Sequence, residues 1–120
     1  MDNQALFQSN LWGDHFRRII DEELAKSRYP LTMSHVMGSR RRSPARVGAV
    51  RRVIVYRLWA ERKWSFSLIA RRIGMDHSTV IYHVRQMILA GGLPEPVPQH
   101  VLDYGRKYGL LVEGANYDNG

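Results

Sequence analysis

The hydrophobic positions near the start of the chain repeat at the spacing of an amphipathic helix. The apolar stripe falls at i, i+3, i+4 and i+8 and consists of Phe16, Ile19, Ile20 and Leu24. It predicts a helix from Asp14, acting as N-cap, to about Lys26. Pro30 closes this unit, because the residue before a proline avoids the helical conformation. For residues 1–13 the pattern leaves open a short helix or an unstructured lead.

The middle of the chain predicts two further helical segments around a basic loop. Residues 32–37 have the pattern of a short helical turn that ends at Gly38, and glycine, serine and proline mark residues 39–48 as a loop. A long helix is expected from Ala49 to about Arg62. Its inward side would carry Val50, Val53, Ile54 and Leu58, and its outward side Arg51, Arg52 and Arg62.

Three more helices are expected after this segment. Ser65 is the predicted N-cap of a helix through Ile73, and Asp76 is the predicted N-cap of a helix that continues to about Ala90. The buried stripe of the second of these is Val80, Ile81, Val84, Met87 and Ile88. Glycines and prolines between residues 91 and 98 end it, and residues 99–108 predict one more short helix before a polar tail at 113–120. Since no useful period-2 run occurs, the fold class is all-α.

Positive charge is concentrated in one part of the sequence. The 120 residues contain 18 Lys and Arg against 11 Asp and Glu, which gives a net charge of +7 and an isoelectric point near 10.2. Between Arg40 and Arg72, eleven basic residues stand against one acid, Glu61. So dense a block of one sign predicts a surface that meets a polyanion, since a merely solvated face normally has interspersed acids.

The sequence lacks the motifs that several classes of function require. The chain has no cysteine, which excludes disulfides and Cys-ligated zinc, and it has no phosphate loop, dinucleotide turn, HExxH helix or GxSxG elbow. Scattered histidines without acidic companions do not predict a metal site. We therefore expect no enzyme activity and no cofactor. We also expect no membrane segment and a cytoplasmic protein, because the start of the chain is polar and no long apolar stretch follows.

Residues 65–87 have the organisation of a helix-turn-helix. The small residue expected where the helices contact each other is Ala70, and the flexible turn residue is Gly74. Val80 is the apolar residue expected to pack between the two helices. Short hydrogen-bonding side chains open the second helix, where a recognition helix enters the major groove: Asp76, His77, Ser78 and Thr79. An acid beside a polyanion is costly, and Asp76 offsets that cost by accepting from a cytosine amino group, by capping its own helix, or by both.

At these residues the chain resembles a known family. The run Met75-Asp76-His77-Ser78-Thr79-Val80, followed by Arg85-Gln86-Met87, resembles the signature of the C-terminal DNA-binding domain of the bacterial replication initiator DnaA. Residues 51–56 and 65–69 are similar to two further helix segments of that family, and Arg40 to Arg42 match its basic loop. The resemblance covers about residues 16–90. It implies a helix-turn-helix bundle of the DnaA C-terminal and Trp-repressor-like kind over residues 14–92, with 1–13 as a lead and 93–120 as a connection, short helix and tail.

The resemblance also implies which residues meet DNA. Asp76 to Thr79 would touch base edges in the major groove, and Arg40, Arg41 and Arg42 would enter the adjacent minor groove. Arg51, Phe66, Ser67 and Gln86 would lie near phosphates or groove edges. Beside what the resemblance implies, we predict that Arg52, Tyr82 and Arg85 also bind DNA. Ser67, Trp59 and Gln86 depart from the family pattern, which puts the target sequence in question but not the docking mode.

The chain has no room for the nucleotide-binding AAA+ module of the initiator, so we expect a stand-alone reader of DnaA-box-like sites in a bacterial or phage-infected cell, associated with the nucleoid. It would regulate transcription or replication. The alternative is an adaptor that binds an acidic protein through the same basic face. The two terminal segments are candidates for a homodimer or protein contact, and RNA binding is less favoured, since no stacking sheet is indicated.

The aromatic residues among the arginines are interpreted mainly as core. Tyr56, Trp59, Trp64 and Phe66 fall at spacings that more often serve packing than base stacking. Tyr82 lies on the outward side of its helix and is the better candidate for a nucleic-acid contact.

Overall fold

The computed structural model describes residues 3–27, 30–38 and 45–111, with side chains from residue 15 onward. These residues form helices α1 (Asn3–Lys26), α2 (Met33–Val36), α3 (Ala45–Arg62), α4 (Phe66–Ile73), α5 (His77–Ala90) and α6 (Gln99–Lys107). No strand occurs among them, so the predicted all-α class is confirmed. Arg40, Arg41, Arg42 and the tail at 113–120 lie outside the described residues.

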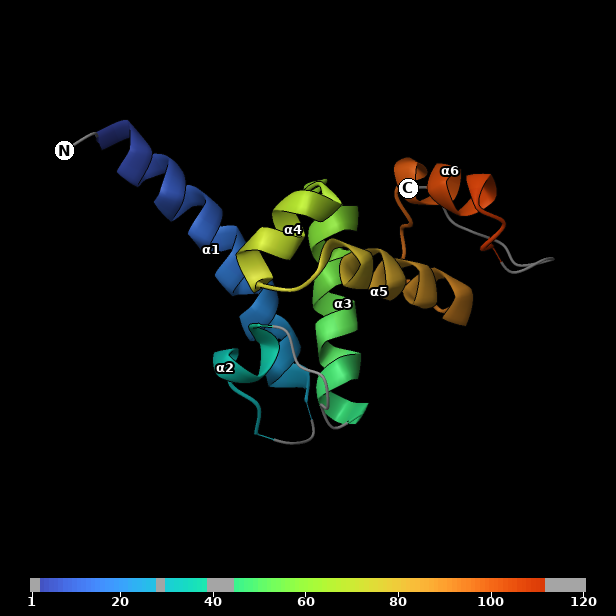
Figure 1. Cartoon of the computed structure of the whole chain (residues 1–120), viewed down its shortest axis with the longest axis horizontal. Helices are drawn as coiled ribbons and strands as arrows, with labels where there is room; N and C mark the ends of the chain where they lie inside the picture. Colours follow the sequence, from blue (N-terminus) through green and yellow to red (C-terminus); the bar gives the residue numbers. More distant parts are fainter. Residues whose placement is uncertain (1–2, 28–29, 39–44, 112–120) are drawn as a thin grey trace.

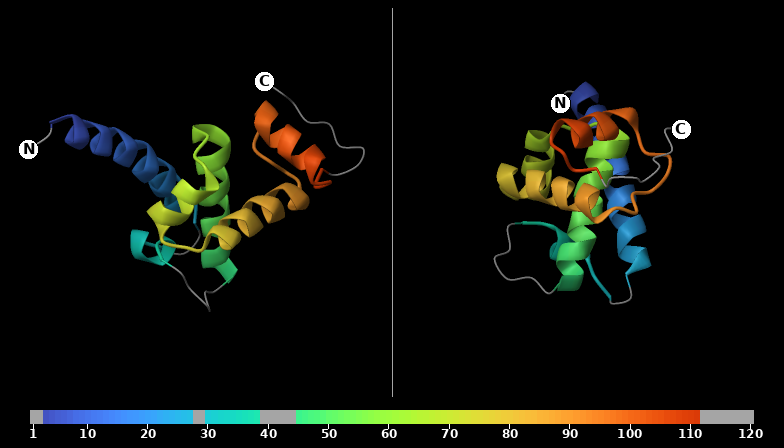
Figure 2. Two further views of the ribbon diagram at one scale, coloured as in Figure 1. Left: turned by 45° about the horizontal axis from the view of Figure 1, so that its top comes forward. Right: turned by 90° about the vertical axis from the view of Figure 1, so that its right-hand side faces the viewer.

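Helix α3 is the central element of the fold. It contacts α1, α2, α4 and α5, and Figure 1 shows it running through the middle of the molecule with α1 on one side and α6 on the other. The left view of Figure 2 shows the first half of α1 extending away from the other helices. Helices α4 and α5 both pack against α3 and against each other, so the turn that joins α4 to α5 lies beside α3.

The core follows the predicted apolar stripes. Ile20, Ile54, Val80, Val84 and Ile88 are fully buried in one cluster that draws on α1, α3 and α5. Ile81, Met87, Val50 and Val53 from the expected stripes are only partly buried.

The segment after residue 92 belongs to the same core. It contributes Leu93, Val97, Val101, Leu102 and Leu110 to the cluster. At the other end, α1 runs without a break across residues 13 and 14. The division of the chain at residues 13 and 92 stays a prediction.

Two predicted helix starts are wrong. Asp14 is not an N-cap, because α1 begins at Asn3 and continues through it. Likewise α3 begins at Ala45 rather than Ala49 and includes Gly48. A glycine inside a helix costs about 1 kcal/mol relative to alanine, and burial of Val47 in the extended first turn offsets that cost.

The other expected boundaries are confirmed. Thr32 is the N-cap residue of α2, and the Ser65 side chain accepts a hydrogen bond from the Leu68 amide at 3.1 Å at the start of α4. Gly74 ends α4 with a φ of 83°, in the left-handed region that glycine adopts without strain. Residues 74–76 then form the short turn between α4 and α5, and buried Ala70 and Val80 lie where the helices meet.

Candidate nucleic-acid interface

The N-terminal turn of α5 presents polar side chains to solvent. Asp76, His77 and Ser78 are exposed and Thr79 is partly buried. The backbone carbonyl of Asp76 accepts from the amides of Thr79 and Val80, at 3.0 and 3.1 Å, so the turn is regular. Val80 has no exposed surface and fixes the helix from its inner side. The first turn of α5 is therefore an exposed polar tip whose inner side is anchored in the core by Val80.

Asp76 occupies the predicted N-cap position without making the predicted side-chain bond. Its carboxylate forms no capping hydrogen bond to the helix. Capping by the side chain is thus a wrong expectation, and the first-turn amides are arranged by the backbone alone. Asp76 is exposed, so its carboxylate oxygens are accessible to hydrogen-bond donors outside the helix.

An aromatic cluster centred on Phe66 packs next to the first turn of α5. The Phe66 ring lies 6.3 Å from the His77 ring, 5.6 Å from Trp59 and 5.8 Å from Tyr104, measured between ring centres. Trp59 and Tyr56 are buried, as their spacing predicted, and Trp64 stacks on Phe16. Phe66 is itself partly buried, so its ring orients His77 rather than standing free at the surface.

Arg51 is buried, which contradicts its predicted place on the outward side of the helix. Only 5% of its surface is exposed, and its guanidinium donates to the backbone carbonyl of Gly38. The Gly38 amide in turn donates to the carbonyl of Ile73 at 2.6 Å. Gly38 is therefore tied to both α3 and α4 immediately before the segment that carries Arg40 to Arg42, whose expected minor-groove role stays a prediction.

Arg52, on the next position of α3, reaches α5. Its guanidinium carbon lies 5.7 Å from the centre of the Tyr82 ring, and Tyr82 is 55% exposed, as predicted. Arg52 is partly buried, and its Nε and His83 Nδ1 are buried without a hydrogen-bond partner. Burial, together with the charges of Arg52 and Arg51, lowers the pKa of His83 to about 4. This junction of α3 and α5 places the positive charge of Arg52 beside an exposed aromatic ring.

Arg85 is held against α6. Its Nε donates to the Tyr104 hydroxyl at 3.1 Å, and its guanidinium carbon lies 4.4 Å from the centre of the Tyr108 ring. The hydrogen bond to Tyr104 raises the pKa of Arg85. Of the remaining predicted contacts, Ser67 is exposed and Gln86 is partly buried.

The sequence patterns did not reveal the contribution of α6 to this surface. Tyr104 and Tyr108 stand four residues apart, a spacing that places both rings on one face of a helix. That signal points to a shared contact but does not identify Arg85 as its partner. His83 was also missed, since its place beside Arg51 and Arg52 depends on how α3 and α5 cross.

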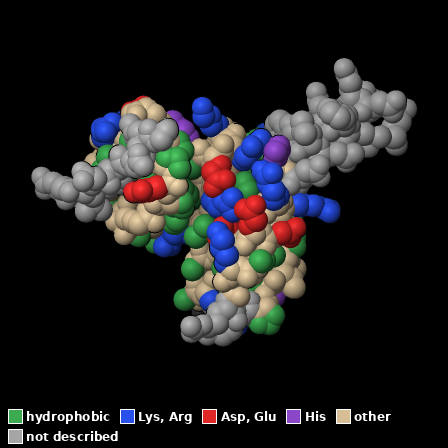
Figure 3. Space-filling model, turned by 180° about the vertical axis from the view of Figure 1, so that it is seen from behind, with side chains coloured by type: hydrophobic (Ala, Val, Ile, Leu, Met, Phe, Trp, Pro, Cys, Tyr) green, Lys and Arg blue, Asp and Glu red, His purple; other side chains and the backbone are tan. Residues whose placement is uncertain are grey.

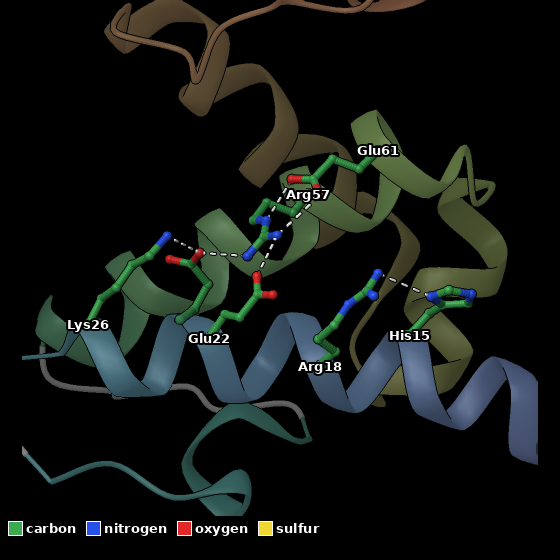
Figure 4. Close-up of polar contacts among 7 residues, drawn as sticks. His15, Arg18, Glu22, Lys26, Arg57 and Glu61 are labelled. Atoms are coloured by element: carbon green, nitrogen blue, oxygen red, sulfur yellow. Dashed lines mark hydrogen bonds and ion pairs between the residues drawn. The ribbon is translucent and has the colours of Figure 1, made fainter.

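The other basic residues of the central block are not all directed to a polyanion. Arg57 makes ion pairs with Glu22, Glu23 and Glu61, at 2.8, 2.9 and 2.6 Å (Figure 4). These contacts raise the pKa of Arg57 and lower that of Glu22. The face seen from behind correspondingly shows basic and acidic side chains intermixed (Figure 3). Two of these acids come from α1, which a count along the window from 40 to 72 cannot include.

Two histidines outside the tip, His35 and His100, have hydrogen-bond partners within the protein. His100 Nε2 lies 2.9 Å from the carbonyl oxygen of Ala60, and His35 Nδ1 accepts from the Thr32 amide at 3.0 Å. Within the described part of the chain, no three His, Asp or Glu residues are grouped in a way that would hold a metal ion. Nor is any helix of that part long and apolar enough to cross a membrane.

Comparison with protein-family models, with curated proteins and with solved structures gave no match for this chain.

Proposed function

We propose that this protein binds double-stranded DNA sequence-specifically, as a transcription or replication regulator at DnaA-box-like sites, with α5 in the major groove. The observation that carries the proposal is the tip of α5, where Asp76, His77 and Ser78 are exposed. The opposite side of α5 is anchored by fully buried Val80, Val84 and Ile88. An α-helix about 10–12 Å across fits a major groove about 12 Å wide.

The chemistry of the tip suits base edges. His77 and Ser78 can donate and accept hydrogen bonds, the Asp76 carboxylate can accept from a cytosine amino group, and the methyl group of Thr79 suits a thymine methyl. A carboxylate without a capping bond at this position is otherwise unfavourable next to phosphates. A carboxylate at the tip therefore suits base reading better than general attraction to a polyanion.

Positive charge beside the tip suits the DNA backbone. Arg52 lies against exposed Tyr82, one turn of α5 beyond the tip. Arg40 to Arg42 would contact the minor groove, as the resemblance to the DnaA DNA-binding domain implies. Arg51 is no longer assigned a phosphate, because its guanidinium is occupied by the Gly38 carbonyl.

Selection from a random duplex pool tests this function. Bound duplexes are recovered, sequenced and assayed by fluorescence anisotropy at several salt concentrations. We expect a short consensus and an affinity that falls by about 10³ to 10⁵ between 50 and 200 mM salt, which corresponds to six to ten phosphate contacts. Absence of any salt-sensitive binding to duplex DNA contradicts the proposal and favours an adaptor that binds an acidic protein.

A further inference from the structure

Helix α6 brings a second group of cations to the side of α5. The Tyr108 ring has Arg85 at 4.4 Å and Lys107 Nζ at 5.4 Å from its centre. Arg106, Lys107 and Tyr108 are all exposed, and Tyr108 retains 43% of its surface. Each cation is attracted to the Tyr108 ring, so this ring holds two like charges at one part of the surface.

An exposed acid on the same helix only partly compensates this group. Asp103 lies 3.7 Å from Arg106 in an exposed ion pair and also accepts from Gln99. Such exposed pairs contribute about 0–1 kcal/mol. Among the described residues, no ion pair involves Lys107 or Arg85. Arg85 and Lys107 are therefore available to bind an anion from outside the protein.

The location of the group fits the rim of the groove that α5 would occupy. A continuous aromatic path leads from His77 through Phe66 and Tyr104 to Tyr108, with successive ring centres 6.3, 5.8 and 4.7 Å apart. Arg85 stands nine residues after Asp76, about 13 Å along the helix axis. The major groove is only about 8.5 Å deep, so a helix inserted by its tip carries Arg85 past the base edges to the level of the backbone.

The group also lies across α5 from Arg52. Arg52 belongs to the first half of α3, whereas α6 packs on the second half through Trp59 and His100. Figure 1 shows the first half of α3 on one side of α5 and α6 on the other.

We propose that Lys107, Arg106 and Arg85 form a second phosphate-binding group, which contacts the backbone strand on the side of the major groove opposite to Arg52. The inference rests on the proposed DNA-binding function and deepens it, because it assigns a role to α6. Tyr104 and Tyr108 are its positioning residues: they hold Arg85 and Lys107 in place and need not touch DNA.

The test compares two variants that remove the same charge. Arg106→Gln/Lys107→Gln alters the group on α6, and Arg17→Gln/Arg18→Gln removes two exposed arginines from α1, on the other side of α3. Thermal unfolding verifies that each variant is folded, and the slope of log affinity against log salt is measured for the selected duplex and for a random one.

We expect the α6 variant to lower the magnitude of that slope by about 1 for each phosphate that the variant no longer neutralises, equally for both duplexes, and the α1 variant to leave it unchanged. Lys107→Gln alone, which preserves the Arg106–Asp103 pair, should lower it by about 1. Equal slopes for the α6 and α1 variants would overturn the inference while leaving the DNA-binding function intact. Absence of duplex binding by the unaltered protein would overturn both.

Discussion

Arg51 donates a hydrogen bond to the backbone carbonyl of Gly38, thirteen residues earlier in the chain. The bond connects α3 to the end of the segment that follows α2, and Gly38 is also bonded to the last residue of α4. A buried arginine thus fixes the point from which the chain enters residues 39–44. A residue that the sequence predicts as a phosphate contact thus has a structural role in the fold.

Replacing Arg51 should therefore destabilise the protein. Arg51→Met keeps the aliphatic stem but removes the donor, which leaves the Gly38 carbonyl without this partner, and we expect the free energy of unfolding to fall by about 1–3 kcal/mol. Urea denaturation measures the change. Arg62→Met, at an exposed position of the same helix, is the control and should alter it by less than about 0.5 kcal/mol. Equal effects at the two positions would refute the structural role of Arg51.

Arg57 should contribute more to stability than its exposed neighbours. Arg57→Met leaves the nearly buried carboxylate of Glu23 paired only with Lys26, and we expect a loss of about 2 kcal/mol in the free energy of unfolding. The matched change Lys26→Met removes a cation that is 69% exposed and should cost less than about 0.5 kcal/mol. A smaller effect at Arg57 than at Lys26 would be inconsistent with an ion-pair network that joins α1 to α3.

His83 should make stability depend on pH. Its pKa is lowered from 6.5 to about 4, so between these values the folded protein binds fewer protons than the unfolded chain. The free energy of unfolding should fall as the pH decreases from about 6.5 towards 4, and it should fall less in His83→Gln. Denaturation at pH 7 and pH 5 compares the two proteins. The same pH dependence in both would show that His83 is not the group responsible.

Arg52 should act on DNA without discriminating among sequences. Arg52→Gln removes a charge that contacts Tyr82 and makes no ion pair in the described part of the chain. We expect weaker binding to every duplex and a salt slope smaller by about 1. Anisotropy titrations with the selected and a random duplex measure both quantities. Weakening confined to the selected duplex would mean that Arg52 reads bases instead.

Much of the fold follows from local signals in the sequence. Ser65, Gly74 and the apolar stripe of α5 predicted the α4–α5 unit because caps, turns and helical spacing act over a few residues. Asp14 and Gly48 were misleading for the same reason: a local cap or glycine signal does not end a helix whose neighbouring residues favour continuation. Arg51 is buried against a partner 13 residues away, and Arg85 donates a hydrogen bond to Tyr104, 19 residues away. The spacing of residues along the sequence does not reveal such contacts.

The most direct test of the central claim is a pair of selections from one random duplex pool, performed with the unaltered protein and with His77→Ala. Because His77 is exposed, the variant should keep its stability. We expect the unaltered protein to return a consensus and the variant to lose preference at one or two of its positions, at a cost of about 1–3 kcal/mol there, while binding of random duplex is unchanged. An identical consensus from both proteins, or an equal loss of affinity for selected and random duplex, would contradict base reading by the tip of α5.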